Sequence, residues 1–297
     1  SAASDVYNRH NKNTTVANVY PAPKRHWVGD GFYVHTMFHY KQTYKNLDPF
    51  LLMDYAAPYH YKGGREQVRG VGEHPHRGFE TVTIAFAGEL EHTDSHGGGG
   101  VIGTGDVQWM TAGSGVMHQE FHSKAFSQTG GTMEMVQLWV NLPKAHKLTN
   151  PQYQAIKSGD IPVVDMGDKG KVRIIAGQFG DVTGAASTFT PINLWDITLK
   201  AKQSQRFDLP QSHNILILMR EGHISIDDTH ANACELITFN KNVSAITITA
   251  ESDSKLLILS GEPINEPIVG YGPFVMNSQD EIDTALRDLK TGQFVRI

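Results

Sequence analysis

The chain has 297 residues, of which 39% are hydrophobic and 19% are charged, and its formal net charge at pH 7 is −5. This length exceeds the roughly 100–200 residues of a single domain and favours two domains. The acidic balance argues against a basic face for phosphates, so we expect no direct binding to nucleic acid. No apolar run approaches the roughly 18–20 residues that span a bilayer, so we expect no membrane association. Cys234 is the only cysteine, which suits a reducing compartment, and we expect a soluble, cytoplasmic protein.

Short segments with alternating side chains run through the chain and predict β-strands. In residues 82–87, Val82, Ile84 and Phe86 alternate with smaller residues, which is the two-residue period of a strand with two unlike faces. Further strands are predicted at 133–142, 215–219, 223–226, 245–249 and 255–260. Turn signals such as Asp227-Asp228 separate them. Many short strands at close spacing favour an all-β fold of sandwiches or barrels over a β-α-β sheet.

One helix is predicted near the end of the chain. Ser278 and Glu281 have the spacing of a capping box, and Gly292 is a natural stop. Between them lies an apolar stripe at helical spacing, formed by Ile282, Ala285, Leu286 and Leu289. We expect this stripe to pack against a barrel wall.

The domain junction is predicted in the polar stretch 143–160, which contains Pro143, Pro151 and Gly159. Few large apolar residues interrupt this stretch, as is usual for a linker. We therefore divide the chain into an N-terminal domain, residues 1–148, and a C-terminal domain, residues 149–297.

Two histidine-containing pairs carry the clearest functional signal. His74-Pro75-His76 and His118-Gln119-Glu120 share the same i, i+2 spacing. Residues i and i+2 of a strand point to the same face, so two neighbouring strands can direct four side chains to one point. Three imidazoles and one carboxylate suit a divalent transition metal such as Fe, Mn, Co, Ni, Cu or Zn. A single H-x-H pair is often coincidental, but two such pairs about one β-meander apart favour a metal site.

The remaining histidines do not show this spacing. His92, His96 and His122 lie near the pairs in sequence, but we expect each to be a solvated loop residue. His213, His223 and His230 are scattered through the second half, so we expect the C-terminal domain to be metal-free.

Several segments resemble the pirin family, whose members are bicupin proteins. These segments are His74–Val82 (HPHRGFETV), Gly105–Gly113 (GDVQWMTAG), Gly115–Glu120 (GVMHQE), His26–Gly31 (HWVGDG), Asp48–Asp54 (DPFLLMD), Gly261-Glu-Pro and Tyr271–Asn277 (YGPFVMN). They extend over most of the chain. The resemblance implies two stacked antiparallel β-barrels (double-stranded β-helices) with a short C-terminal helix.

The resemblance also implies one metal ion, usually iron, in the N-terminal barrel. The family's HxH and later HxE ligand positions match His74, His76, His118 and Glu120, while the second barrel has no ligand set. Glu80 stands where many cupins place a fourth ligand, and strand parity suggests that it points inward. The family pattern puts the acidic ligand at Glu120 instead, which makes Glu80 either a supporting group beside the ligands or a structural group.

Two functions follow from the resemblance. The first is a quercetin 2,3-dioxygenase, in which a flavonol-like aromatic substrate reacts with dioxygen and Glu120 is the catalytic base that accepts the 3-hydroxyl proton. The second is a non-catalytic, redox-sensitive pirin that regulates through a protein partner. We favour the dioxygenase, because a metal with open positions beside a base is suited to chemistry. A metal-dependent isomerase on the same scaffold is a third, less supported alternative.

Overall fold

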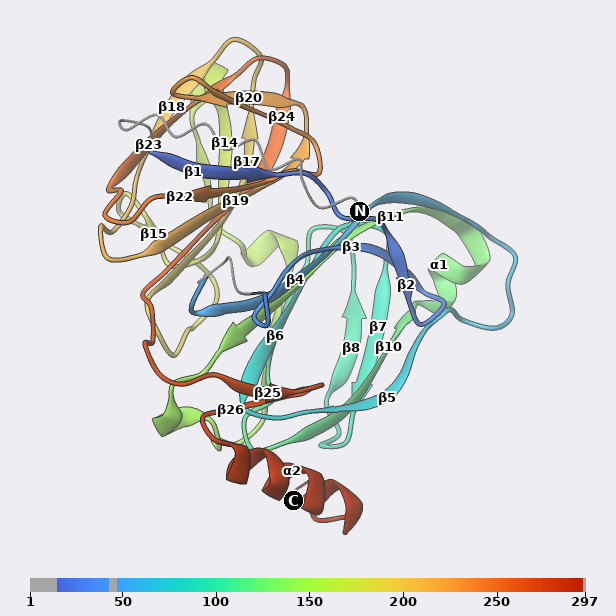
Figure 1. Ribbon diagram of the computed structural model, residues 1–297. Helices are drawn as coiled ribbons and strands as arrows, with labels where there is room; N and C mark the ends of the chain where they lie inside the picture. The colour runs from blue at the N-terminus through green and yellow to red at the C-terminus, as the bar shows by residue number, and fades with distance from the viewer. Residues whose placement is uncertain (1–14, 43–46, 296–297) are drawn as a thin grey trace, which may run out of the picture. The chain divides into compact units, whose positions relative to one another are not determined.

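The computed structural model describes residues 15–42 and 47–295 (Figure 1). These residues form two compact units, each built from segments that are distant in sequence. Within the described residues, we call 23–160 with 264–295 the N-terminal unit, and 15–22 with 161–263 the C-terminal unit. Within the described residues, no helix has the length and apolar character that a membrane span requires.

The N-terminal unit contains two antiparallel sheets and a small hairpin. The seven-stranded sheet has the order β12-β9-β6-β11-β4-β3-β2 and the four-stranded sheet the order β5-β10-β7-β8, while β25 pairs with β26. The elements are β2 (His26–Val28), β3 (Phe32–His39), β4 (Phe50–Lys62), β5 (Gly70–His76), β6 (Phe79–Ala87), β7 (Leu90–Asp94), β8 (Gly99–Ile102), β9 (Val107–Thr111), β10 (Val116–His122), α1 (Lys124–Thr129), β11 (Gly130–Asn141), β12 (Gln152–Ile156), β25 (Val269–Tyr271), β26 (Phe274–Met276), α2 (Gln279–Lys290) and the short 3-10 turns Lys144–His146 and Ser158–Asp160.

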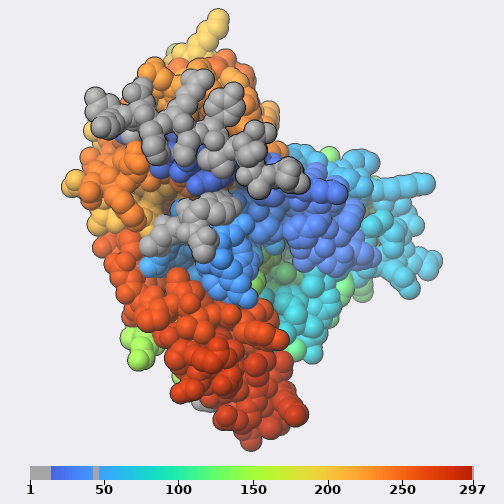
Figure 2. Space-filling model, in the orientation of Figure 1, coloured from blue at the N-terminus to red at the C-terminus, as the bar shows by residue number. Residues whose placement is uncertain are grey.

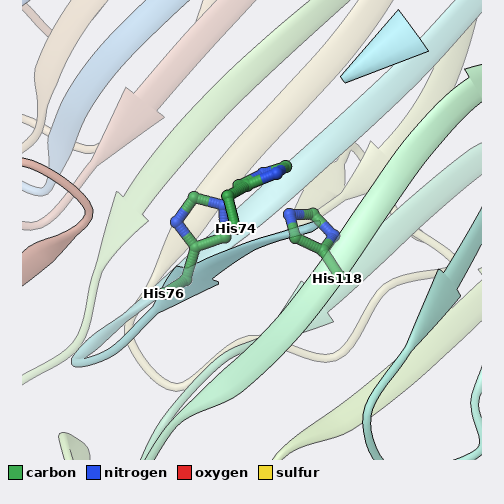
Figure 3. Close-up of side chains that lie close together, drawn as sticks. All are labelled: His74, His76 and His118. Carbon is green, nitrogen blue, oxygen red and sulfur yellow. The ribbon is translucent and has the colours of Figure 1, made fainter. Parts of the chain in front are cut away.

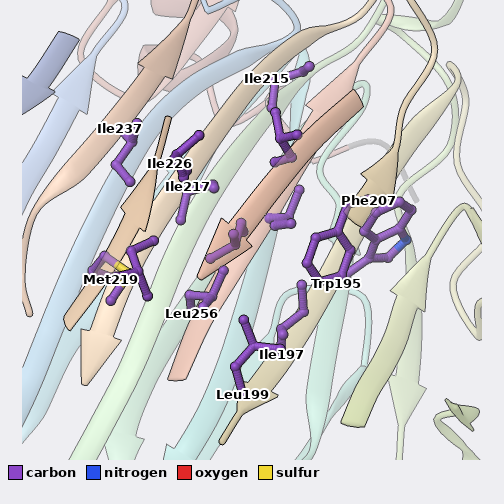
Figure 4. Close-up of a cluster of buried hydrophobic side chains, with 14 of the residues drawn as sticks. Trp195, Ile197, Leu199, Phe207, Ile215, Ile217, Met219, Ile226, Ile237 and Leu256 are labelled. Atoms are coloured by element: carbon purple, nitrogen blue, oxygen red, sulfur yellow. The ribbon is translucent and has the colours of Figure 1, made fainter. Parts of the chain in front are cut away.

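The C-terminal unit repeats this plan with a seven-stranded sheet, β1-β22-β19-β24-β17-β14-β13, and a four-stranded sheet, β18-β23-β20-β21. One buried aliphatic and aromatic cluster, with Trp195 and Phe207 among its members, draws side chains from both sheets (Figure 4). The elements are β1 (Val16–Tyr20), β13 (Val163–Asp165), β14 (Gly170–Ala176), β15 (Gln178–Phe179), β16 (Val182–Thr183), β17 (Ile192–Leu199), β18 (Ser204–Asp208), β19 (Asn214–Glu221), β20 (His223–Ile226), β21 (Thr229–Asn232), β22 (Leu236–Phe239), β23 (Ala245–Ala250), β24 (Ser254–Gly261) and the 3-10 turn Gly167–Lys169.

The two units do not coincide with a single cut between residues 148 and 149. Strand β12 follows that point but pairs with β9, so the N-terminal unit continues to Asp160. The chain also returns to this unit after Pro263, while β1, from the start of the chain, pairs with β22 of the C-terminal unit. These exchanges arise because a terminal strand or hairpin is placed by its backbone hydrogen bonds to distant strands, which a local change in composition does not reveal.

The predicted C-terminal helix is present as α2, with Ser278 as its N-cap. The Ser278 side chain accepts a hydrogen bond from the backbone N–H of Glu281, as the capping box predicts. Ile282 and Ala285 are buried in a cluster that includes Phe274 of the hairpin β25–β26. Leu289 is 38% exposed, so the apolar stripe is narrower than the sequence suggested. In Figure 2 the C-terminal segment, coloured red, lies on the surface of the molecule.

Candidate metal centre and its cavity

Three predicted ligands meet inside the N-terminal unit. His74 and His76 lie on β5 and His118 on β10, and the register of these strands places His118 directly opposite His74. The ring centroids are 4.3 Å apart for His74 and His118, 4.8 Å for His76 and His118, and 4.9 Å for His74 and His76. One nitrogen from each ring lies within 4.8 Å of the others, and the three rings gather around a common point (Figure 3). A small shift of the side chains would place one nitrogen of each ring ~2.0–2.1 Å from a shared metal ion, which is the distance that ligation requires.

The hydrogen bonds of these rings suit metal ligands. The Nδ1–H of His74 donates to the Gly72 carbonyl oxygen at 2.8 Å, which leaves its Nε2 as the unprotonated nitrogen. Within the described residues, His76 Nδ1 and His118 Nε2 are buried without a hydrogen-bond partner. Burial lowers the pKa of all three imidazoles below its ordinary value, so the neutral form that binds a metal is favoured. The donor set therefore fits a divalent transition metal.

Glu120, the predicted fourth ligand, lies near the three histidines but is not one of the converging group. It lies two residues after His118 on β10, where the register with β5 shifts. Its carboxylate instead accepts hydrogen bonds from the side chains of Gln137 on β11 and Thr83 on β6. Burial raises the pKa of Glu120 to about 7, and these two hydrogen bonds limit the rise. The carboxylate is thus held by the seven-stranded sheet that faces the histidines.

A cavity of about 240 Å³ opens beside this group. Ligand pockets usually measure about 300–1,000 Å³, so this cavity lies just below that range. Its polar lining comprises His74, His76, Glu120, Gln137 and Asp54, and its apolar lining comprises Val28, Phe32, Val34, Val71, Met135, Trp139 and Pro273. A mostly apolar wall with a few polar groups is the usual design of a small-molecule site.

Asp54 is a polar wall residue that sequence reasoning did not single out. It stands on β4 directly opposite Gln137 of β11, so the two side chains form a polar pair on the cavity wall. The hydroxyl of Thr36 donates to the Asp54 carboxylate at 2.6 Å. Burial raises the pKa of Asp54 despite this hydrogen bond. A carboxylate directly after the apolar run 50–53 of the same strand was the available signal.

The expectation that Glu80 points inward with the ligands is wrong. Thr83 reaches Glu120, so odd-numbered residues of β6 share the cavity face and Glu80 lies on the opposite face. There it is 1% exposed and accepts a 2.6 Å hydrogen bond from the hydroxyl of Thr111, its partner on β9. Burial raises the pKa of Glu80 to about 7. The turn between β5 and β6 resets the parity that the sequence suggested.

Two of the histidines expected to be solvated are buried. His92 on β7 is 1% exposed and contacts the side chain of Gln108, while His122 is 2% exposed and donates to the Gly31 carbonyl oxygen at 2.8 Å. His96 is exposed, as expected. The difference from the expectation arises because both residues lie in paired strands rather than loops: His92 on β7 is opposite Glu120, and His122 on β10 is opposite Leu90.

The chain as a whole is similar to known proteins. The pirin family model matches residues 31–140, and the model of the pirin C-terminal cupin domain matches residues 194–295. A Pseudomonas aeruginosa protein named as a candidate quercetin 2,3-dioxygenase is 48% identical, over 95% of this chain and 98% of that protein. A second P. aeruginosa protein with the same kind of name is 35% identical, over 84% and 87%.

A solved structure is also similar to this chain over most of its length. The crystal structure of a quercetin 2,3-dioxygenase from Acinetobacter baumannii is 48% identical, covers 95% of this chain and 98% of its own, and superposes with a TM-score of 0.92. The fold class expected from the sequence, an all-β protein with two cupin domains and a short C-terminal helix, is thereby confirmed.

Proposed function

Because the chain belongs to the pirin family, we propose that it is a metal-dependent dioxygenase that cleaves flavonols such as quercetin. The observation that carries the proposal is the group of three imidazoles at an apolar and aromatic cavity that also presents Glu120. Such a site offers both a metal with open positions and a place for an aromatic ring. The names of the relatives in P. aeruginosa and A. baumannii support the same reaction.

His74, His76 and His118 would hold the metal, and Glu120 would move to supply a fourth, anionic ligand. We propose iron, although Mn, Co, Ni, Cu and Zn suit the same donors. When bound, the ion would supply Lewis acidity toward the 3-oxygen of a flavonol and, in the case of iron, a redox-active centre. A cytoplasmic location is part of the proposal and rests on the single cysteine, Cys234.

The cavity wall would orient the substrate. Trp139, whose ring packs at 4.4 Å from that of Phe79, is a fixed aromatic surface against which a planar ring system can lie. Asp54 and Gln137 present hydrogen-bonding groups side by side, and these can bind hydroxyl groups of the substrate. The apolar remainder of the lining excludes water from the reacting atoms.

Glu120 would accept the proton of the 3-hydroxyl group. Gln137 and Thr83 can hold its carboxylate at the cavity as it loosens from the metal, which makes it available to a substrate. Transfer of the proton to a Glu120 oxygen yields the electron-rich flavonolate anion. Dioxygen then adds to this anion, the central ring opens, both oxygen atoms enter the ester product and one carbon leaves as carbon monoxide. Glu120 returns the proton to the product.

The test compares variants of residues on β10 and β5 with a control on β10. Glu120→Gln keeps an oxygen that can bind a metal but removes the proton acceptor, so turnover should fall roughly a hundredfold or more at matched metal occupancy. His76→Ala removes a ligand, so metal content and turnover should fall together. Gln119→Ala is the control, because Gln119 lies between the pair and its side chain bonds to Thr93 instead. Elemental analysis gives the occupancy, and the loss of flavonol absorbance gives the rate.

Two outcomes would contradict the proposal at different levels. If the metal-loaded wild type cleaves no flavonol faster than the free metal does, the dioxygenase is rejected in favour of the redox-sensitive binding protein. If the wild type is active and Glu120→Gln keeps full turnover, the reaction stands and the role of Glu120 does not.

A further inference from the structure

A second group of metal-binding side chains lies in the C-terminal unit. It consists of His223 on β20, His230 on β21 and Glu251, the residue after β23. Glu251 bridges the two histidines: its Oε2 lies 2.9 Å from His223 Nε2, and its Oε1 lies 2.8 Å from His230 Nδ1. One donor atom from each residue lies within 4.8 Å of the other two. The group lies on other strands, and in another part of the sequence, than the histidines on β5 and β10.

The hairpin β20–β21 places the two histidines on one face. A two-residue turn, Asp227-Asp228, pairs Ile226 with Thr229 and therefore Ser225 with His230. Ser225 and His223 are two residues apart and share a face, so His230 lies on that face diagonally across from His223. The positions of His223 and His230 on either side of the Asp227-Asp228 turn are visible in the sequence.

The third member reaches the hairpin through backbone hydrogen bonds. Strand β23 pairs with β20, and Ile224 lies opposite Ala250. The N–H of Glu251 donates to the His223 carbonyl oxygen at 2.8 Å, which fixes the main chain of Glu251 beside that histidine. The backbone positions of all three residues are thus set by strand pairing rather than by a free loop.

The exposure of the group leaves room for an ion and its water ligands. The side chains of His223, His230 and Glu251 are 41%, 60% and 33% exposed. Two imidazoles and one carboxylate form a donor set that zinc uses in proteins, with a remaining position for water. Without an ion, the same contacts are two side-chain pairs at the surface, and exposed pairs of this kind add little to the stability of a protein.

We propose that His223, His230 and Glu251 form a second, surface site for a divalent transition-metal ion, typified by Zn²⁺. The proposal reverses the expectation that the C-terminal half carries no metal, and it does not depend on the function proposed for the N-terminal site. Both oxygens of Glu251 already face an imidazole nitrogen, so small rotations of three exposed side chains suffice to bind an ion between them.

The experiment measures Zn²⁺ bound to the metal-stripped full-length chain by equilibrium dialysis and elemental analysis. The wild type should bind two ions per chain. His230→Ala and Glu251→Gln should each lose the surface ion or bind it more weakly. The loss of affinity should exceed the roughly 10–100-fold that follows from mutating a group that only supports a ligand. Ser225→Ala, on the same hairpin face, should keep both.

A His118→Ala variant separates the two sites. It should lose the interior ion and retain the surface ion, and its Cu²⁺ form should show nitrogen hyperfine coupling in electron paramagnetic resonance that His230→Ala removes. The proposal is overturned if His230→Ala binds Zn²⁺ with wild-type stoichiometry and affinity, or if His118→Ala binds none while its circular dichroism is unchanged. A wild type that binds one ion, which His230→Ala removes and His118→Ala retains, would count against the N-terminal site and not against this one.

Discussion

Replacing Gly78 with alanine should loosen the wall of the metal cavity. Gly78 lies two residues after β5, the strand of His74 and His76, and has a φ of +91°, a region that L residues rarely adopt. A Cβ at this position would overlap the carbonyl oxygen of Val275 and would lie 2.6 Å from Met276 Sδ. The Gly78 N–H donates to Gly113, and its carbonyl oxygen accepts from the buried Lys147 ammonium group. The turn therefore has little freedom to move away.

The expected magnitude is the sum of two effects. Forcing a residue with a side chain into a left-handed conformation costs about 1–2 kcal/mol. Inserting a methyl group into a packed contact costs about 1–3 kcal/mol more. The free energy of unfolding of the N-terminal unit should fall by about 2–5 kcal/mol. Because the displaced strand β26 follows Pro273 of the cavity lining, metal affinity should fall as well.

Gly72→Ala is the matched control. Gly72 lies on β5, the strand before Gly78, has no left-handed φ, and a methyl group on its Cα would meet no heavy atom within 4 Å. Alanine there should leave stability unchanged or raise it by about 0.4–1 kcal/mol, because it restricts the unfolded chain. Denaturant unfolding followed by tryptophan fluorescence reports on this unit through Trp27, Trp109 and Trp139. If Gly78→Ala unfolds at the same denaturant concentration as Gly72→Ala, the steric argument is refuted.

Two further predictions concern stability. Ile282→Ala should lower the free energy of unfolding by about 2–5 kcal/mol, because Ile282 is 1% exposed and packs in one cluster with Phe274. Leu289→Ala, at a 38% exposed position of the same helix, should cost far less; equal shifts in melting temperature would disprove the packing of α2. Burial raises the pKa of Glu80 from 4.5 to about 7, so between these pH values the folded state holds a proton that the unfolded state has lost. The free energy of unfolding therefore falls as pH rises through that window, by up to about 3 kcal/mol. Glu80→Gln should flatten this slope and gain most over the wild type near pH 8; urea midpoints measured from pH 5 to 8 that fall equally in both proteins would rule this out.

Much of the site was visible in the sequence because its geometry is local. The i, i+2 spacing of His74 and His76 places both on one face of a strand whatever the rest of the fold does. The cap at Ser278 and the burial of Ile282 and Ala285 follow from helical periodicity in the same way. A family resemblance carried by long motifs added the fold class.

Other features depended on partners that are distant in sequence. Glu120 shares a face with His118, yet Gln137 and Thr83, from the other sheet, decide where its carboxylate lies. Glu80 turned out to face away because a turn resets strand parity before β6.

By itself, the sequence determined the strands with clear two-residue alternation, the helix that follows Ser278 and the common face of His74 and His76, since these properties arise from neighbours two to four residues apart. Only the tertiary structure decided which segments complete each unit and that Glu251 meets the histidines of the β20–β21 hairpin. Those features are set by backbone hydrogen bonds between strands far apart in the chain. Such pairing leaves no periodic trace in the sequence on either side.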